Sequence, residues 1–259
     1  MRFIGFNTKS QTVGDPAVRQ ALITGLDRNA IIEAAAGGNG TLADSVFNKS
    51  AFSYQAGLNT QYPYDPAQAK QLLAAAGWKD SDGNGFLDKN GQELAVKLVY
   101  SGSWALMGSI APVVYDNWKA LGVNVTLTPL DDATANTDVY DNTSTDKPYE
   151  AFLSGWGLFG TDTAHYSTFF TDDTSYFAYS NSQVTQLFDQ GNKETDPTKR
   201  IAIYQQIDKL LWQELPLIPI FQPIGVYVYR SDLNVDAAQI NGTFLTGLKY
   251  PGRAYFTQQ

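Results

Sequence analysis

Hydrophobic positions recur at helical spacing in six segments of the chain, and most of these segments begin with a capping residue or end with glycine. An aspartate or asparagine before a helix accepts hydrogen bonds from its first free N–H groups, and proline at the first helical position lacks such a group. The pattern therefore predicts six amphipathic helices. Their expected starts are Asp15-Pro16, Asp27, Asp65-Pro66, a position between Ser103 and Ala111, Asn181 and Asp196-Pro197.

Alternating or continuous runs of β-branched and aromatic residues lie between these helices and predict strands. The expected strands are residues 1–6, 94–100, 123–127, 149–156, 217–221 and 226–229. The order strand, helix, strand between Val96 and Leu127 fits a right-handed crossover that joins two parallel strands. The fold class is therefore α/β. Residues 131–148 and 157–180 are polar or irregular, and we expect them to be loops.

Composition excludes several classes of function. The chain has 259 residues, a formal net charge of −8, no cysteine and one histidine, His165. An acidic surface repels the phosphate backbone, so we expect no nucleic-acid partner. Without cysteine there are no disulfides, thiolate metal sites or cysteine nucleophiles, and one histidine excludes multi-histidine zinc sites. No apolar run approaches the roughly 18–20 residues of a membrane span.

An Asp- and Gly-rich segment, Asp80–Asp88, resembles the first part of a calcium-binding loop. Oxygen-bearing side chains recur at alternate positions and a glycine follows, as in EF-hand loops. The position of the final bidentate glutamate holds Gly91, and Glu93 lies two residues beyond it. We therefore predict a polar turn that holds no calcium, and no metal or cofactor elsewhere in the chain.

Aromatic residues and glycines crowd the segment that follows the expected strand 149–156. Several of these aromatic side chains are expected to pack in the core. Trp156 stands between two glycines at the end of a strand, where a ligand can approach the backbone closely. No pair of carboxylates stands in a context that marks a catalytic acid and base, so we predict a binding site and no enzyme. The aromatic residues are Trp156, Phe159, Tyr166, Phe169, Phe170, Tyr176, Phe177 and Tyr179.

Four blocks of sequence resemble the family 5 solute-binding proteins of ABC transporters, which include peptide, dipeptide and nickel receptors. They occur in the family's order and span nearly the whole chain. The first contains Asn7-Thr8, Asp15, residues 18–22 and Leu26-Asp27-Arg28. The second is Tyr64 to Trp78, the third holds Gly155-Trp156-Gly157 and Asp162, and the fourth runs from Glu194 through Arg200 and Tyr204 to Pro219.

The resemblance implies a periplasmic-binding-protein-like fold of type II, class C, with a mixed sheet flanked by helices. Members have two lobes with a ligand cleft between them and are about twice as long as this chain. Residues 7–229 would then form the C-terminal lobe, whereas residues 1–6 and 230–259 would join the other lobe. The expected location is extracytoplasmic, as a cell-surface lipoprotein or a free periplasmic protein.

The resemblance also implies a function, the binding of extended oligopeptides by a monomeric receptor that delivers them to the permease subunits of an ABC importer. Phe159 stands where peptide-binding members often carry an aspartate for the peptide amine, which leaves Asp162 to attract a positive group. The alternative is a carbohydrate-binding module or glycoside hydrolase that uses stacked aromatics and carboxylates. The predicted ligand-binding residues are Trp156, Gly157, Leu158, Phe159, Asp162, Phe221 and Gln222.

Overall fold

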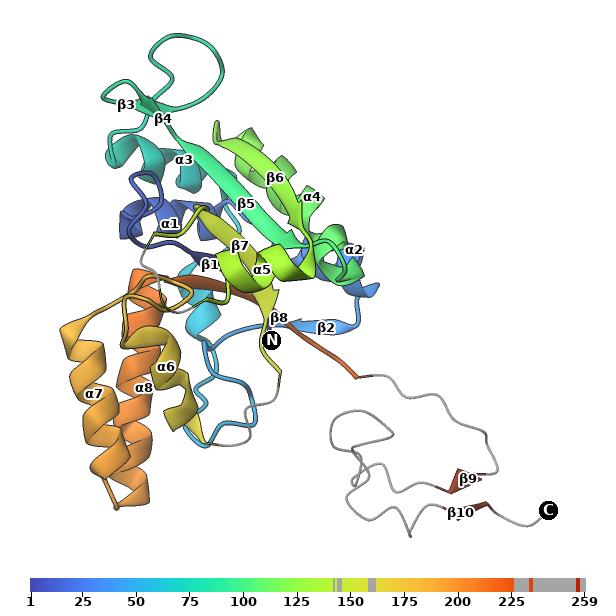
Figure 1. Cartoon of the computed structure of the whole chain (residues 1–259), viewed down its shortest axis with the longest axis vertical. Helices are drawn as coiled ribbons and strands as arrows, with labels where there is room; N and C mark the ends of the chain where they lie inside the picture. Colours follow the sequence, from blue (N-terminus) through green and yellow to red (C-terminus); the bar gives the residue numbers. More distant parts are fainter. Residues whose placement is uncertain (142, 144–145, 158–161, 226–232, 235–254, 257–259) are drawn as a thin grey trace. The chain divides into compact units, whose positions relative to one another are not determined.

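A six-stranded mixed sheet organises the first of two units in the chain, Met1–Pro223 (Figure 1). The structure is a computed structural model, and it describes residues 1–141, 143, 146–157, 162–225, 233–234 and 255–256. The strand order is β2-β8-β1-β7-β5-β6. Its strands are β1 (Arg2–Phe6), β2 (Gly40–Leu42), β5 (Ala95–Ser101), β6 (Asn124–Leu130), β7 (Ala151–Gly155) and β8 (Leu217–Pro223).

The sheet has a parallel and an antiparallel part. Strand β5 runs parallel to both of its neighbours, β6 and β7. Strand β1 runs antiparallel to β7 and β8, and β2 runs antiparallel to β8. The mixed α/β sheet predicted from the sequence is therefore confirmed, as is the parallel crossover from β5 to β6. The predicted strand 226–229 lies outside the described residues.

All six predicted helices are present. At the first of them the Asp15 side chain accepts a hydrogen bond from the Ala17 N–H at 2.9 Å. Pro112 lies inside the fourth helix, so one main-chain N–H is missing there. The helices are α1 (Pro16–Thr24), α2 (Arg28–Ala36), α3 (Pro66–Ala75), α4 (Ala105–Ala120), α7 (Ser182–Lys193) and α8 (Pro197–Glu214).

Short helices occupy parts of both segments that we expected to be loops. Helix α5 (Asp132–Asp138) follows Asp131, whose side chain accepts a hydrogen bond from the Thr134 N–H at 2.9 Å. A 3-10 helix, η2 (Thr163–Tyr166), and α6 (Ser167–Phe170) occupy the second segment. These predictions of loops were wrong because α5 contains only polar or small residues and shows no apolar periodicity, and because η2 and α6 span only one turn each. One further 3-10 helix, η1, covers Leu58–Gln61, and a hairpin pairs β3 (Asp88–Lys89) with β4 (Gln92–Glu93).

A helix covers one face of the sheet, and a cluster of aromatic side chains covers the other. Phe6 stacks on Trp118 of α4, with ring centroids 6.2 Å apart. Phe3, three positions earlier on the same strand, contacts Phe152 and Phe177 instead. Successive side chains of a strand point to opposite faces, so α4 covers one face and an aromatic cluster covers the other. The candidate site lies where both layers reach the end of β7.

The first residues of the chain lie inside this unit. We expected residues 1–6 to join another lobe, but Arg2–Phe6 forms β1, which pairs with β7 on one side and β8 on the other. The second unit is Ile224–Gln259, in which β9 (Leu233–Asn234) pairs antiparallel with β10 (Tyr255–Phe256). Most of residues 230–259 lie outside the described residues. The assignment of residues 7–229 to a C-terminal lobe stays a prediction.

Candidate functional site

A pocket of about 270 Å³ lies at the carboxyl ends of the parallel strands β5 and β7. Strand β5 leads through Trp104 into α4, and β7 ends at Gly155, directly before Trp156. In open α/β sheets, the crevice beyond the carboxyl ends of neighbouring strands is the usual place for a ligand. The residues that line this pocket are Phe3, Trp104, Tyr140, Ser154, Gly155, Trp156, Gly157, Phe169 and Tyr176.

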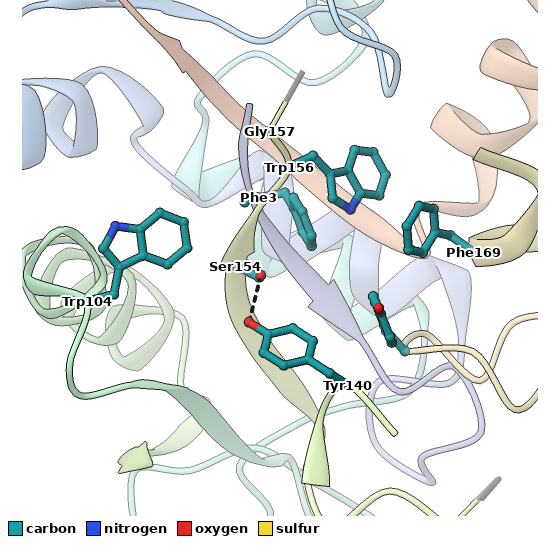
Figure 2. A pocket seen from close by; sticks show the side chains of 9 residues that line it. Phe3, Trp104, Tyr140, Ser154, Trp156, Gly157 and Phe169 are labelled. Atoms are coloured by element: carbon teal, nitrogen blue, oxygen red, sulfur yellow. Dashed lines mark hydrogen bonds between the residues drawn. The ribbon is translucent and has the colours of Figure 1, made fainter. Parts of the chain in front are cut away.

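Aromatic side chains form two opposing walls of the pocket. Figure 2 shows Trp104 on one side, Trp156 and Phe169 on the other, and Tyr140 with Ser154 between them. Trp156 is only 5% exposed, and its ring lies 4.8 Å from Phe3 and 5.3 Å from Phe169, measured between centroids. Trp104 is partly buried and stands directly before α4, the helix that covers the other face of the sheet. Trp156 is therefore both a core residue and a wall of the pocket.

Polar groups of the pocket come from β7 and from the segment after α5. The hydroxyl groups of Tyr140 and Ser154 lie 3.1 Å apart and share a hydrogen bond (Figure 2). Apolar walls with a few placed polar groups are typical of small-ligand sites. The two hydroxyls lie between the walls, where they can orient a bound molecule.

The backbone of Gly155 also faces the pocket. Met1 and Trp156 exchange both main-chain hydrogen bonds, with N···O distances of 3.0 and 2.9 Å. In an antiparallel ladder, the residue next to such a pair directs its N–H and C=O to the other edge of the strand. Strand β5 lies along this other edge of β7, but its pairing with β7 ends at Leu153. The outward main-chain groups of Gly155 therefore lie beyond the end of the ladder, in the pocket.

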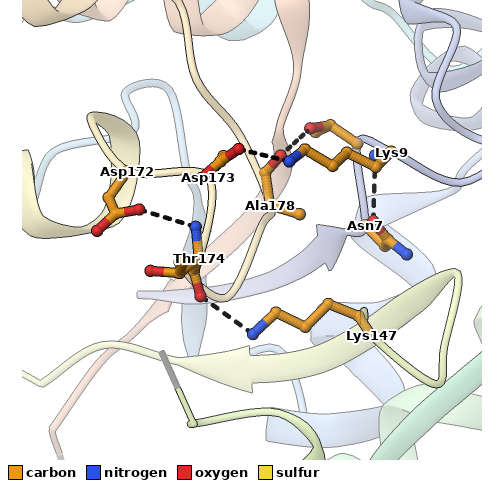
Figure 3. A network of polar contacts seen from close by, with 8 residues as sticks. Asn7, Lys9, Lys147, Asp172, Asp173, Thr174 and Ala178 are labelled. Carbon is orange, nitrogen blue, oxygen red and sulfur yellow. Dashed lines mark hydrogen bonds and ion pairs between the residues drawn. The ribbon is translucent and has the colours of Figure 1, made fainter. Parts of the chain in front are cut away.

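A polar network holds the wall that contains Tyr176. At the end of β1, the Thr8 hydroxyl donates to the carbonyl of Ala178 at 2.9 Å, and Lys9 forms an ion pair with Asp173 at 2.5 Å. Lys147 donates to the carbonyl of Thr174 at 3.1 Å (Figure 3). These contacts fix the segment 173–178 against β1 and the start of β7. Tyr176 is thereby positioned by residues far from it in the sequence.

The structure brings two of the predicted site residues, Trp156 and Gly157, to this pocket. Gly157 is exposed, and its carbonyl accepts a hydrogen bond from the Asn48 side chain at 2.9 Å. Leu158 and Phe159 lie outside the described residues. Their role as ligand contacts stays a prediction.

The other predicted site residues lie elsewhere. Phe221 is fully buried in β8, and Gln222 pairs with Thr41 of β2, so neither lines the pocket. The carboxylate of Asp162 accepts a hydrogen bond from the Ala164 N–H at 3.0 Å and forms an ion pair with Arg200 at 3.2 Å. Both contacts engage one oxygen of Asp162, which lowers its ability to anchor a positive group of a ligand.

Seven lining residues were not among the predicted site residues: Phe3, Trp104, Tyr140, Ser154, Gly155, Phe169 and Tyr176. Phe169 and Tyr176 belong to the aromatic segment noted in the sequence, and Gly155 adjoins Trp156. A signal was available for Trp104, because it follows a strand that was predicted to be parallel to its neighbour. Aromatic residues at the carboxyl ends of parallel strands meet at one edge of a sheet. No such signal exists for Phe3, since its place depends on the antiparallel pairing of β1 with β7.

Comparison with known proteins identifies the family. Residues 1–178 match the model of the bacterial extracellular solute-binding proteins, family 5 Middle. The chain belongs to this family. Its members are solute-binding proteins and not enzymes, in agreement with the prediction from the sequence. No helix in the described part of this family member is long and apolar enough to cross a membrane.

Several relatives with assigned solutes match most of the chain. The oligopeptide-binding protein AppA of Bacillus subtilis is 28% identical over 226 residues, which cover 85% of this chain and 41% of AppA. The glutathione-binding protein GsiB of Shigella flexneri is 25% identical over 231 residues, covering 85% of this chain and 42% of GsiB. Heme-binding protein A of Haemophilus influenzae is 26% identical over 228 residues, covering 86% and 39% of the two chains.

Solved structures confirm the periplasmic-binding-protein-like fold. AppA of Bacillus subtilis in complex with a nonapeptide has a TM-score of 0.79 and 27% identity, covering 86% of this chain and 44% of that one. NikA of Brucella suis in complex with Fe(III)-EDTA has a TM-score of 0.73 and 23% identity, covering 86% and 45%, and shares the fold. The chain thus spans less than half the length of these family members.

Proposed function

We propose that the protein is the solute-binding component of an ABC importer and that its solutes are extended oligopeptides. The observation that carries this proposal is the pocket at the end of β7, where aromatic walls flank the outward main-chain groups of Gly155. A peptide can extend a sheet edge through main-chain hydrogen bonds while its side chains enter pockets beside the strand. Such binding depends little on peptide sequence, which suits a nutrient receptor.

Similarity to AppA supports peptides over other solutes of the family. AppA is described as an oligopeptide-binding protein, and its structure holds a nonapeptide. Relatives named for glutathione and haem match with 25% and 26% identity, so the family as a whole accommodates varied solutes. In this chain, the strand edge at Gly155 favours a ligand with a repeating amide backbone.

The proposed mechanism is closure of two lobes around the peptide. The present chain supplies one wall of the cleft, and a lobe outside it supplies the other. Within this wall, Trp156 would pack against the peptide and Gly157, Leu158 and Phe159 would present main-chain groups. The proposal also keeps three residues outside the pocket as contacts of the peptide, and lobe closure would have to bring them closer to it. They are Asp162, Phe221 and Gln222.

Membership of an extracellular solute-binding family supports the remaining parts of the proposal. The partners are the oligopeptide and the permease subunits of the importer, and the receptor acts as a monomer. Its location is extracytoplasmic, as a cell-surface lipoprotein or a free periplasmic protein. No cofactor or metal takes part in binding.

Native mass spectrometry of the complete protein, purified without denaturation, tests this function. The expected result is a set of bound masses that differ by amino-acid residue masses and that are released as peptides on denaturation. Bound sugars would favour the carbohydrate-binding alternative, and a bound haem or metal chelate would assign another solute class. Either result, without peptide, would overturn the proposal.

A further inference from the structure

A cationic side chain, Arg2, lies beside the pocket, next to two residues that line it, although Arg2 itself is not a lining residue. The Arg2 guanidinium carbon lies 4.5 Å from the centre of the Trp104 ring. Arg2 pairs with Gly155 across the β1–β7 ladder, and a Cβ atom built on Gly155 would meet an Arg2 terminal nitrogen at 2.4 Å. Both Trp104 and Gly155 line the pocket. The Arg2 side chain therefore passes Gly155 and ends against Trp104, beside the pocket.

Arg2 has no counter-charge among the residues that the structure describes. The described residues form two ion pairs, Lys9 with Asp173 and Arg200 with Asp162, and neither includes Arg2. The Nε atom of Arg2 is buried and has no hydrogen-bond partner there. A buried donor without a partner costs free energy, because it has lost its contacts with water. Burial also lowers the pKa of Arg2 from its ordinary value.

The position of Arg2 is fixed by the fold rather than by a partner of opposite charge. Trp104 holds the guanidinium plane by a cation–π contact, and the missing side chain of Gly155 leaves the space through which Arg2 passes. A planar guanidinium with free N–H groups matches the geometry of a carboxylate, which it can bind through two parallel hydrogen bonds. The Arg2 side chain is therefore positioned to bind an anionic group.

The charge at the pocket also differs from the one we expected from the sequence. Asp162 was expected to attract a positive group, but its carboxylate forms an ion pair with Arg200. The charged side chain that the fold does place against Trp104 and Gly155 is Arg2. The pocket therefore favours a negative group of the solute at this point.

We propose that Arg2 is a specificity-determining residue that binds a carboxylate of the solute at the Trp104 side of the pocket. The inference rests on the proposed peptide-binding function and adds the chemistry of one subsite to it. Two parts of a peptide could supply the carboxylate, its C-terminus or an acidic side chain. Both present the same two oxygen atoms to the guanidinium.

Four pools of randomised nonapeptides test the proposal with the complete protein. The pools combine a free or amidated C-terminus with the presence of Asp and Glu or their replacement by Asn and Gln. Peptides retained after gel filtration are quantified by mass spectrometry for the wild type and for Arg2→Gln, Arg2→Lys and Lys193→Gln. Lys193 is an exposed residue at the end of α7, so Lys193→Gln removes one positive charge elsewhere on the surface.

The wild type and Lys193→Gln should retain carboxylate-bearing peptides at least about tenfold better than their neutral counterparts, as expected for a charge-assisted hydrogen bond. Arg2→Gln should lose this preference, and Arg2→Lys, which keeps the charge but lacks the paired N–H groups, should keep only part of it. Melting temperatures verify that both variants are folded. A preference for free C-termini would identify the terminal carboxylate, and a preference for Asp and Glu would identify a side chain.

Two results would overturn the inference and can be told apart. If the wild type retains peptides but ignores their charge, or if Arg2→Gln and Arg2→Lys match Lys193→Gln, Arg2 binds no carboxylate while the peptide-binding function stands. If no pool is retained by the wild type, the peptide-binding function fails, and the role of Arg2 fails with it.

Discussion

Substituting Asp208 by asparagine should make the stability of the protein less dependent on pH. Asp208 lies on α8 and is fully buried. Its carboxylate accepts hydrogen bonds from the Ser45 hydroxyl at 2.6 Å and from the Val46 N–H at 2.9 Å. Burial raises the pKa of Asp208 from 3.8 to about 7, and the two hydrogen bonds only partly oppose this effect.

The sign of the effect follows from proton binding. Between about pH 4 and pH 7, the folded protein keeps a proton on Asp208 that the unfolded chain releases. Folding is therefore favoured at low pH, and this contribution is lost as the pH rises through the pKa of the folded state. From pH 5 to pH 8 the loss amounts to about 3 kcal/mol, at about 1.4 kcal/mol per pH unit over roughly two units.

Urea denaturation at pH 5 and pH 8 measures this change. Asparagine is neutral throughout, and its amide can still accept from Val46 and donate to Ser45. Between pH 5 and pH 8, the free energy of unfolding of Asp208→Asn should therefore rise by about 3 kcal/mol relative to that of the wild type. Asp189→Asn, an exposed substitution on α7, is the control and should leave the pH dependence unchanged. Equal pH dependence in wild type and Asp208→Asn would refute the reasoning.

Three further predictions concern the site and the Asp- and Gly-rich turn. Trp156→Ala should cost about 3–5 kcal/mol of stability because the ring is 5% exposed, whereas Trp104→Ala, partly exposed at the opposite wall, should cost clearly less in the same denaturation assay. Gly155→Ala should be destabilised by about 1–3 kcal/mol, because its new Cβ would lie 2.9 Å from the main-chain oxygen of Met1, which is held in the sheet, as well as 2.4 Å from a terminal nitrogen of Arg2. Gly157→Ala, with no described atom within 4 Å, should not be destabilised, and equal melting temperatures of the two variants would contradict this. Calorimetry with millimolar calcium should show no saturable binding to the turn, and binding that disappears in Asp82→Ala would show the opposite.

The chain's local sequence determined its helices and most of its sheet strands. Aspartate before proline marks a helix start because the side chain and the missing N–H act within one turn, and the structure places helices after Asp15, Asp65 and Asp196. The strand around residue 98 shows a local alternation as well, because Val96 and Leu98 are buried whereas Ala95 is exposed and Lys97 is half-buried. The same local reasoning failed for α5, whose residues are all polar or small.

The candidate site was determined by tertiary structure. The sequence singled out Trp156 and Gly157, because a tryptophan between glycines at a strand end is itself a local pattern. It could not place Phe3 and Arg2 beside them, since the partner of a strand depends on distant pairing and register. The same limit applies to Asp208, whose raised pKa arises from burial beneath a segment some 160 residues away in the chain. Capping and periodicity act over a few residues, whereas pocket walls and desolvation arise only when distant segments pack together.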